Sequence, residues 1–424
     1  MKFALASYGT RGDIEPSAAI GLELLRRGHE VRLAVPPDLV SFVEAMGLEA
    51  VPYGPRLQDF LDEDFLRNMW TDFLRSAWTI RGPIRLAGKV WEPIIRHWAD
   101  VSATLMSLAN DADLLSTGIN FEQAAANVAE HYALPLVTLH HFPTRPNGQL
   151  IPTLPSPLVR SGGRVVDWLY WRSTKAVENE QRRELGLPKA TIPSPRRIAE
   201  RGSLEIQAYD EVCFPGLAAE WTEWRGRRPF VGALTMELST NADDEVASWI
   251  AAGTPPICFA AGSIPLESPS ATVEMVSSAC AQLGERALVC AGGSDVTDLP
   301  HIDHVKVVGP VNYATIFPSC RAVVHHGGSG TTAASLRAGI PTLILWSSAD
   351  QPYWGAQVKR LKVGTARRFS ATTRESLVAD LRQILAPEYA ARARELATRM
   401  TKPAESISRA ADLLEEAIRR KIPG

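Results

Sequence analysis

Cysteine is scarce and unpatterned in this chain of 424 residues. The five cysteines are odd in number and form no CxxC pair, and several lie in apolar segments where a thiol behaves as a small hydrophobic side chain. Such usage argues against a disulfide framework and against a zinc site, and it fits a reducing compartment. The sequence therefore predicts a cytoplasmic protein.

An excess of one charge is also absent. Forty-five Lys and Arg residues face 47 Asp and Glu residues, which leaves a formal net charge of −2. A near-neutral chain supplies no overall field for following a phosphate backbone, so the balance argues against nucleic acid as a partner.

Long apolar runs are missing as well. No stretch approaches the ~20 apolar residues that a membrane-spanning helix needs. Residues 1–7 are too short for the apolar region of a signal peptide and predict a buried first strand. We therefore expect a soluble protein, located in the cytoplasm, that can still touch the inner face of a membrane.

Short apolar segments alternate with helical patterns from the start of the chain. Strands are predicted at 2–7, 30–35 and 48–51, with helices at 16–27 and 39–46 between them. This order predicts a parallel, doubly wound sheet. Residues 56–109 are helical in pattern and rich in aromatics, strands resume at 113–117 and 135–140, and the Pro, Gly and Ser content of 147–163 predicts a long loop.

A second cycle of the same kind fills the other half of the chain. Strands are predicted at 256–261, 286–290, 305–308, 322–325 and 342–346, with helices at 271–283 and 331–338. The length itself predicts two or three domains. We predict an α/β protein with two facing Rossmann-like domains, residues 1–232 and 233–403, and a final helix at 404–424 that packs back on the first domain.

The most informative segment is a glycine-rich turn between a strand and a helix, His326-Gly327-Gly328-Ser329-Gly330-Thr331-Thr332. Glycines let backbone N–H groups approach a ligand, and a helix N-terminus favours an anion. No lysine precedes the Ser or Thr, so this is not a Walker loop. A plain turn with a histidine in the core is the alternative, but the convergence of His, Ser and Thr favours phosphate binding.

An acid and an amide follow the next predicted strand. Asp350 and Gln351 lie just after residues 342–346, where their side chains are suited to hydrogen bonds with the hydroxyls of a sugar. Taken by themselves, they are better explained by an Asp cap on the following helix.

These segments resemble a known family. His326 to Thr332, Arg337-Ala338-Gly339-Ile340-Pro341 and Asp350-Gln351-Pro352 resemble the donor-binding signature of family 1 nucleotide-sugar glycosyltransferases. Gly9-Thr10-Arg11-Gly12-Asp13-Ile14-Glu15-Pro16 is similar to the opening of the bacterial branch, which includes natural-product, sterol-type and mycobacterial glycopeptidolipid glycosyltransferases.

The resemblance implies the GT-B fold, with the donor in the second domain, the acceptor in the first and the reaction in a cleft between them. It implies inverting transfer of a hexose or deoxyhexose from a UDP- or TDP-sugar to a hydroxyl of a lipophilic acceptor, without a metal or a cofactor. The residues that the family pattern assigns to the donor are Gly262, Ser263, Val311, His326, Gly328, Ser329, Gly330, Thr331, Asp350 and Gln351.

Asp13 is the candidate general base, because it matches the acid that some antibiotic-tailoring relatives carry in the first loop. From spacing alone, a cap on the first helix explains Asp13 equally well.

The acceptor side has no motif. Large aromatics can together build an apolar acceptor pocket, although core or interdomain packing is the better explanation of any single one. The candidates are Trp70, Trp78, His140, His141 and Trp168; at least one of the two histidines is expected to be buried in the core.

Two other functions share this architecture. A sugar-nucleotide epimerase would bind the same donor without an acceptor, and a degenerate fold could serve as a non-catalytic partner of another enzyme.

Overall fold

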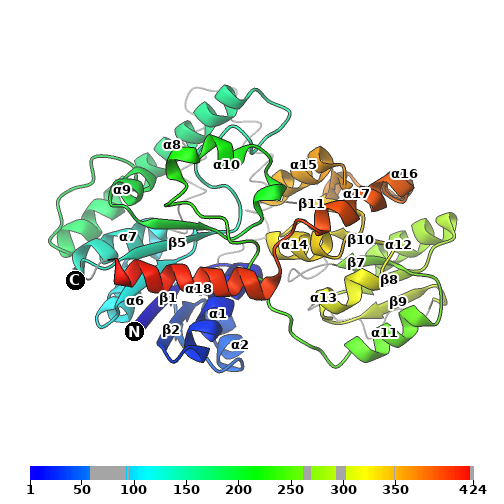
Figure 1. The fold of residues 1–424 in the computed structure, drawn as a ribbon, viewed down its shortest axis with the longest axis horizontal. Helices are drawn as coiled ribbons and strands as arrows, with labels where there is room; N and C mark the ends of the chain where they lie inside the picture. The colour runs from blue at the N-terminus through cyan, green and yellow to red at the C-terminus, as the bar shows by residue number, and fades with distance from the viewer. Residues whose placement is uncertain (58–91, 93–94, 261–268, 293–301, 348, 421–424) are drawn as a thin grey trace. The chain divides into compact units, whose positions relative to one another are not determined.

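The computed structural model describes residues 1–57, 92, 95–260, 269–292, 302–347 and 349–420. Its contacts divide the chain into two units (Figure 1). Unit 1 contains Met1–Tyr209, Gly216–Leu234 and Pro403–Gly424, and unit 2 contains Asp210–Pro215 and Thr235–Lys402.

Unit 1 is built on a sheet of six parallel strands in the order β3-β2-β1-β4-β5-β6. These strands are β1 (Lys2–Ala6), β2 (Glu30–Val35), β3 (Glu49–Pro52), β4 (Leu114–Thr117), β5 (Leu136–His140) and β6 (Leu204–Gln207). Every residue of β4 and β5 is buried, as expected for a sheet with helices on both faces.

The helices of unit 1 cover this sheet with apolar faces. In α6, Trp98, Val101, Leu105 and Leu108 recur at helical spacing and are buried in one core. The helices are α1 (Arg11–Arg26), α2 (Val40–Glu44), α6 (Trp98–Ala109), α7 (Glu122–His131), α8 (Ser156–Glu184), α9 (Ser194–Glu200), α10 (Leu217–Glu220) and α18 (Pro403–Arg419).

Unit 2 repeats the arrangement with strands in the order β12-β11-β10-β7-β8-β9. The strands are β7 (Ile257–Ala260), β8 (Ala287–Cys290), β9 (Val305–Val308), β10 (Ala322–His325), β11 (Thr342–Trp346) and β12 (Gly364–Arg368). The helices are α11 (Asp243–Ala251), α12 (Pro269–Leu283), α13 (Tyr313–Ile316), α14 (Ser329–Arg337), α15 (Gln351–Leu361), α16 (Arg374–Ile384) and α17 (Pro387–Ala397).

Both units have the Rossmann strand order, so the prediction of two Rossmann-like α/β units is confirmed. In such a sheet the chain reverses its direction of winding between the first and fourth strands, and ligands bind outside the carboxyl ends there. This switch point lies between β1 and β4 in unit 1 and between β7 and β10 in unit 2.

Two sequence-based boundaries were wrong, and two strands were missed. Helix α1 begins at Arg11 rather than at residue 16, because Thr10 caps it and Pro16 is accommodated inside the helix. Helix α8 begins at Ser156, within the predicted loop, because Pro157 lies in the first turn, where its missing N–H costs nothing. Strands β6 and β12, at one edge of each sheet, were not predicted.

Within the described part of the chain, no helix combines the length and the apolar character that crossing a bilayer requires.

Candidate functional site

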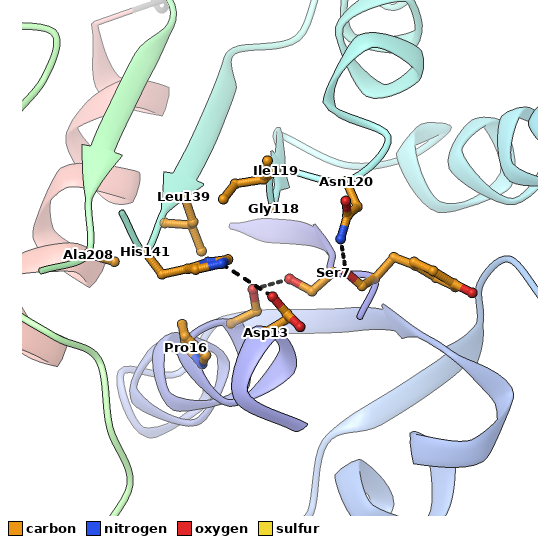
Figure 2. A pocket seen from close by; sticks show the side chains of 11 residues that line it. Ser7, Asp13, Pro16, Gly118, Ile119, Asn120, Leu139, His141 and Ala208 are labelled. Carbon is orange, nitrogen blue, oxygen red and sulfur yellow. Dashed lines mark hydrogen bonds and ion pairs between the residues drawn. The ribbon is translucent and has the colours of Figure 1, made fainter. Parts of the chain in front are cut away.

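A pocket lies at the switch point of unit 1, at the carboxyl ends of β1, β4, β5 and β6 (Figure 2). It is lined by Ser7, Tyr8, Asp13, Pro16, Ser17, Gly118, Ile119, Asn120, Leu139, His141 and Ala208. The doubly wound sheet therefore brings the first βα loop and the end of β5 together.

Asp13 occupies the first turn of α1 and uses its two carboxylate oxygens differently. Oδ2 accepts hydrogen bonds from the backbone N–H of Thr10 at 2.7 Å and from the Thr10 hydroxyl at 3.0 Å. Oδ1 lies 3.3 Å from Nε2 of His141. Asp13 is thus part of a capping box with Thr10 and at the same time contacts a pocket histidine. The two explanations of Asp13 are compatible.

The loop before Asp13 is shaped to hold this carboxylate. Gly9 has a φ of +142°, and a Cβ at this position would lie 2.3 Å from Oδ2 of Asp13, so only glycine fits. Asn120 donates to the carbonyl oxygen of Tyr8 at 2.9 Å, which ties the loop to the end of β4. Arg11 lies over the ring of Phe42 at 4.7 Å.

The two adjacent histidines have different environments. His141 lines the pocket and is partly exposed, whereas His140 is fully buried, with Nε2 3.0 Å from Oε1 of Glu122. Successive side chains of a strand point to opposite faces, which explains the contrast. His140 is therefore a core histidine and does not line the pocket.

A buried network of charges lies around His140. Arg145 donates to both oxygens of Glu122, at 2.7 and 3.0 Å, and pairs with Glu205, which also accepts from Arg228 at 3.1 Å. Burial opposes the ionisation of Glu122, but the charge of Arg145 and the contact with His140 outweigh it and lower the pKa of Glu122 to about 2. The network thus connects α7 and β6 to the segment that follows His141.

In unit 2, the glycine-rich turn connects β10 to α14. Gly328 is the N-cap of α14, and a Cβ there would lie 2.5 Å from Nε2 of His326. The imidazole therefore lies against the start of the helix. The N–H groups of Ser329, Gly330 and Thr331 open the first turn, where N–H groups have no partner within the helix.

His325, at the end of β10, is buried, His326 is partly buried, and both are uncharged at neutral pH. Burial lowers the pKa of His326 to about 4, and burial together with His326 lowers the pKa of His325. Nδ1 of His325 accepts from the N–H of Gly327 at 3.0 Å. Nε2 of His325 and Nδ1 of His326 have no hydrogen-bond partner among the described residues. The turn thus retains polar capacity for a ligand.

The remaining donor candidates have these positions. Asp350 is the N-cap residue of α15 and accepts from the indole N–H of Trp354 at 3.1 Å. The buried Gln351 accepts from the N–H of Ser347 at 2.8 Å through Oε1. Val311 is buried. Gly262 and Ser263 lie outside the described residues, as do Trp70 and Trp78.

Trp168 is half exposed on α8 and does not line the pocket.

The sequence did not predict one contact that the structure shows, the one between Asp13 and His141. The contact between Asp13 and His141 joins positions far apart in the chain, and the only sequence signal was the His-His pair at a strand end. Within the described residues, no group of three or more His, Cys, Asp or Glu side chains is placed to hold a metal ion.

Two family models match the chain. The glycosyltransferase family 28 N-terminal domain matches residues 3–107, and the erythromycin biosynthesis protein CIII-like C-terminal domain matches residues 279–413. An uncharacterized glycosyltransferase of Mycobacterium tuberculosis is 63% identical over 423 residues, which cover 99% of this chain and 100% of that protein. The chain belongs to the glycosyltransferases. The family resemblance of the motifs is thereby confirmed, and the protein is an enzyme.

More distant relatives extend the comparison. A sterol 3-beta-glucosyltransferase of Arabidopsis thaliana is 30% identical over 389 residues, which are 86% of this chain and 57% of that protein. The solved structure of the calicheamicin glycosyltransferase has a TM-score of 0.72 at 19% identity, covering 100% of this chain and 98% of its own. The solved structure of glycosyltransferase VinC in complex with dTDP has a TM-score of 0.65 at 18% identity, covering 99% of this chain and 100% of its own. The enzyme has the GT-B fold.

Proposed function

We propose that this glycosyltransferase transfers a hexose or deoxyhexose from a UDP- or TDP-sugar to a hydroxyl of a lipophilic acceptor, with inversion and without a metal or a cofactor. One observation supports it most directly: each unit places a histidine with distinct chemistry at its switch point, His141 beside Asp13 and His326 against α14. Transfer needs a base for the acceptor and stabilisation for the leaving diphosphate.

The base is the pair formed by His141 and Asp13. The Asp13 carboxylate faces Nε2 of His141, so it favours the tautomer with a proton on Nε2 and leaves Nδ1 to accept the proton of the acceptor hydroxyl. Asp13 then stabilises the imidazolium that forms. The acceptor oxygen bonds to the anomeric carbon while the bond from that carbon to the diphosphate oxygen breaks.

The donor diphosphate binds at the start of α14. The first-turn N–H groups and the helix dipole stabilise the negative charge that develops on the leaving group. His326 adds a neutral imidazole donor, with hydroxyls from Ser329 and Thr331. Asp350 and Gln351 take the hydroxyls of the donor sugar, Val311 contacts the nucleobase, and Gly262 and Ser263 contact phosphate.

An exposed surface of α8 supports a lipophilic acceptor drawn from a membrane. Apart from Met1 and Phe369, the large apolar side chains that are exposed among the described residues are Leu154, Leu158, Val165, Val166 and Trp168. We call these five residues the α8 apolar patch. Helical spacing places the four on α8 on its outward side, opposite the buried Trp171.

The charges around the α8 apolar patch fit the surface of an anionic bilayer. Arg164 and Arg172 are exposed beside it, and the sole acid between residues 151 and 177 is Asp167, whose pKa burial raises to about 6. A helix with apolar side chains, tryptophan and arginine on its outward side binds in the interfacial region of anionic lipid. The patch is therefore proposed to bring the enzyme to the membrane that holds its acceptor.

A transfer screen tests the proposed function. The full chain is incubated with UDP- and TDP-sugars and with sterol, lipopeptide and polyketide acceptors, and products are detected by mass spectrometry. A product heavier than its acceptor by one hexose or deoxyhexose, with an inverted anomeric centre, supports the proposal. Epimerisation of the donor without acceptor, and no transfer to any acceptor, would favour an epimerase instead.

A further inference from the structure

The segment Arg337-Ala338-Gly339-Ile340-Pro341 has no role in the reaction proposed above, yet Arg337 makes a concentrated set of contacts. It is the last residue of α14. Its Nε donates to the carbonyl oxygen of Thr401 at 2.8 Å, and its NH1 donates to the hydroxyl of Thr235 at 2.7 Å. Its NH2 lies 3.9 Å from Oδ2 of Asp210, which accepts from the N–H of Thr401 at 2.6 Å through Oδ1.

These partners share one property, which is their place in the chain. Asp210 and Thr235 are each the first residue after the chain passes from unit 1 into unit 2, and Thr401 is one residue before the end of unit 2 at Lys402. A single guanidinium therefore holds three of the passages between the units to the last turn of α14. Its planar fork of donors is suited to several acceptors at fixed angles.

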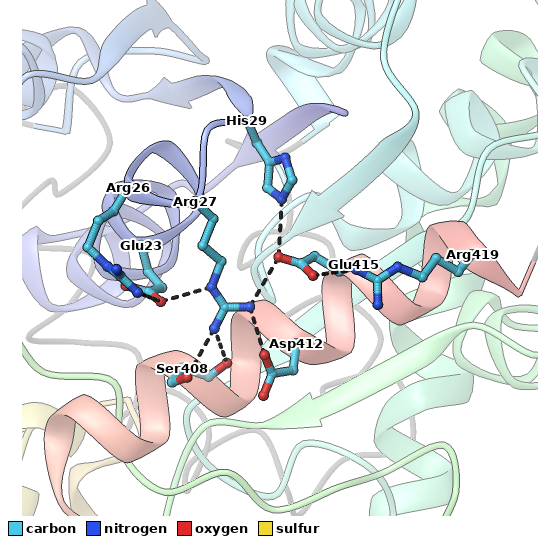
Figure 3. A network of polar contacts seen from close by, with 8 residues as sticks. All are labelled: Glu23, Arg26, Arg27, His29, Ser408, Asp412, Glu415 and Arg419. Atoms are coloured by element: carbon cyan, nitrogen blue, oxygen red, sulfur yellow. Dashed lines mark hydrogen bonds and ion pairs between the residues drawn. The ribbon is translucent and has the colours of Figure 1, made fainter.

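The chain that leaves Thr401 is anchored again in unit 1. Helix α18 packs along α1, and Arg27 at the C-cap of α1 binds it (Figure 3). Arg27 NH1 donates to Asp412 at 2.7 Å and to Glu415 at 3.1 Å, and NH2 donates to the carbonyl and hydroxyl oxygens of Ser408 at 3.1 and 3.0 Å.

Helices α14 and α1 each carry proposed site residues in their first turn. The first turn of α14 takes the diphosphate in the proposed function, and the first turn of α1 contains Asp13. The last turns of both are fastened to one continuous segment, residues 401–415, which we call the C-terminal tie. A packed helix moves as a rigid body, so a shift at one of its ends is felt at the other.

We propose that Arg337 is a positioning residue that couples nucleotide binding at α14 to α1 and Asp13 through the C-terminal tie. The inference rests on the proposed nucleoside diphosphate site. Coupling between two sites is a free energy that appears at each of them when the other is occupied. Binding of a nucleoside diphosphate should therefore change the tie and α1, and the change should require Arg337.

Amide hydrogen exchange of the full chain, measured by mass spectrometry with and without saturating UDP or dTDP, tests this directly. In the wild-type chain, nucleotide should slow exchange in peptides covering 326–337 and also, by about fivefold, in peptides covering 401–415 and 11–27. In Arg337→Gln the first effect should persist and the second should disappear.

Arg286→Gln is the matched control. Arg286 also lies in unit 2 and makes several hydrogen bonds, donating to the backbone carbonyl oxygens of Trp249, Ile250 and Thr254. None of these three residues adjoins a passage between the units. Its variant should keep the nucleotide effect on the C-terminal tie. Should Arg337→Gln not fold, Thr235→Val removes one contact of Arg337 and should weaken the effect.

The possible results separate the two proposals. Slower exchange at 326–337 with no change at 401–415 in the wild-type chain would overturn the coupling and leave the donor site intact. The same change at 401–415 in Arg337→Gln as in wild type would also overturn it. No effect of either nucleotide at 326–337 would refute the donor site itself, and the coupling with it.

Discussion

The two units have the same strand order and carry their candidate residues at the same switch point. They differ in whether the polar groups of these residues already have hydrogen-bond partners within the protein. In unit 1 the carboxylate of Asp13 is held by Thr10 and His141, inside a loop that Asn120 fastens. In unit 2 the turn before α14 keeps buried imidazole nitrogens without a partner among the described residues.

This contrast matches two different chemical tasks. A base must be oriented before the substrate arrives, so its hydrogen bonds are made within the protein. A site for an anion works best when its donors are fixed but not yet paired, because each then gains a partner on binding. One fold thus holds the proposed base through hydrogen bonds within unit 1 and leaves imidazole nitrogens unpaired among the described residues at the proposed anion site of unit 2.

The largest expected effect comes from breaking the pair in unit 1. His141→Ala should lower kcat about a thousandfold, since general base catalysis contributes on the order of 10²–10⁴. Asp13→Asn should also lower kcat, because it removes the charge that stabilises the imidazolium. Steady-state kinetics should show the loss, and Asp111→Asn, an exposed acid of unit 1, should show none. A large loss in Asp13→Asn with little loss in His141→Ala would identify Asp13 as the base.

Glu205→Gln tests whether the buried charge network next to the unit 1 site stabilises the fold. Glu205 is fully buried and pairs with Arg145 and Arg228, so its neutralisation leaves buried arginines with too little negative charge. The free energy of unfolding in urea should fall by about 3–5 kcal/mol. Glu180→Gln, which breaks an exposed pair with Arg183, should leave the unfolding midpoint nearly unchanged. Equal midpoints for the two variants would contradict this role.

The proposed anion site of unit 2 is tested by His326→Ala. Loss of an imidazole at the start of α14 should lower kcat about a hundredfold, as loss of one donor to a developing negative charge does elsewhere, and should weaken dTDP binding measured by calorimetry. His304→Ala is the control, because His304 contacts Ser277 rather than α14. Unaltered kinetics in His326→Ala would refute the site.

The burial of His326 predicts a dependence of stability on pH. Its pKa is about 4 in the folded protein and is ordinarily 6.5, so the unfolded chain binds more protons between these values. Stability should therefore fall as the pH is lowered from 6.5 to 4, by up to roughly 3 kcal/mol from this group. Urea unfolding across this range should show a smaller fall in His326→Ala than in wild type. An identical fall would show that His326 is solvated.

The smallest effect is expected at the membrane. The double variant L158S/V165S should bind vesicles that contain anionic lipid at least about tenfold more weakly than wild type, because each buried apolar side chain contributes ~1.5–3 kcal/mol. Co-sedimentation measures this. Phe369→Ser removes an exposed aromatic from unit 2 and should bind like wild type. Equal binding by all three proteins would exclude the α8 apolar patch as the surface that binds the membrane.

The two units also differed in how far the sequence predicted them. In unit 2 the turn from His326 to Thr332 is local, so its strand, glycines and helix start were evident from neighbouring residues. In unit 1 the pairing of Asp13 with His141 depends on how β1 and β5 are arranged in one sheet, which no local pattern encodes. The sequence suggests Trp168 for an acceptor pocket, whereas the structure places it on the exposed side of α8.

Strand β6 was missed for a related reason. Its residues Glu205 and Gln207 are polar yet fully buried, because arginines from elsewhere in the chain compensate the carboxylate. A charged residue in a buried strand is costly without such a partner, and a hydrophobicity pattern does not reveal the partner. The sequence predicts α1 too short, because proline is typical of a helix's first turn, whereas Pro16 lies inside this helix.

Gly9 sets a rule for anyone who wishes to redesign this enzyme for new acceptors. Any side chain at position 9 would collide with the Asp13 carboxylate and turn it away from His141. Libraries aimed at acceptor choice should therefore keep glycine there. Diversity belongs at Ile119 and Leu139, which line the same pocket as the proposed base.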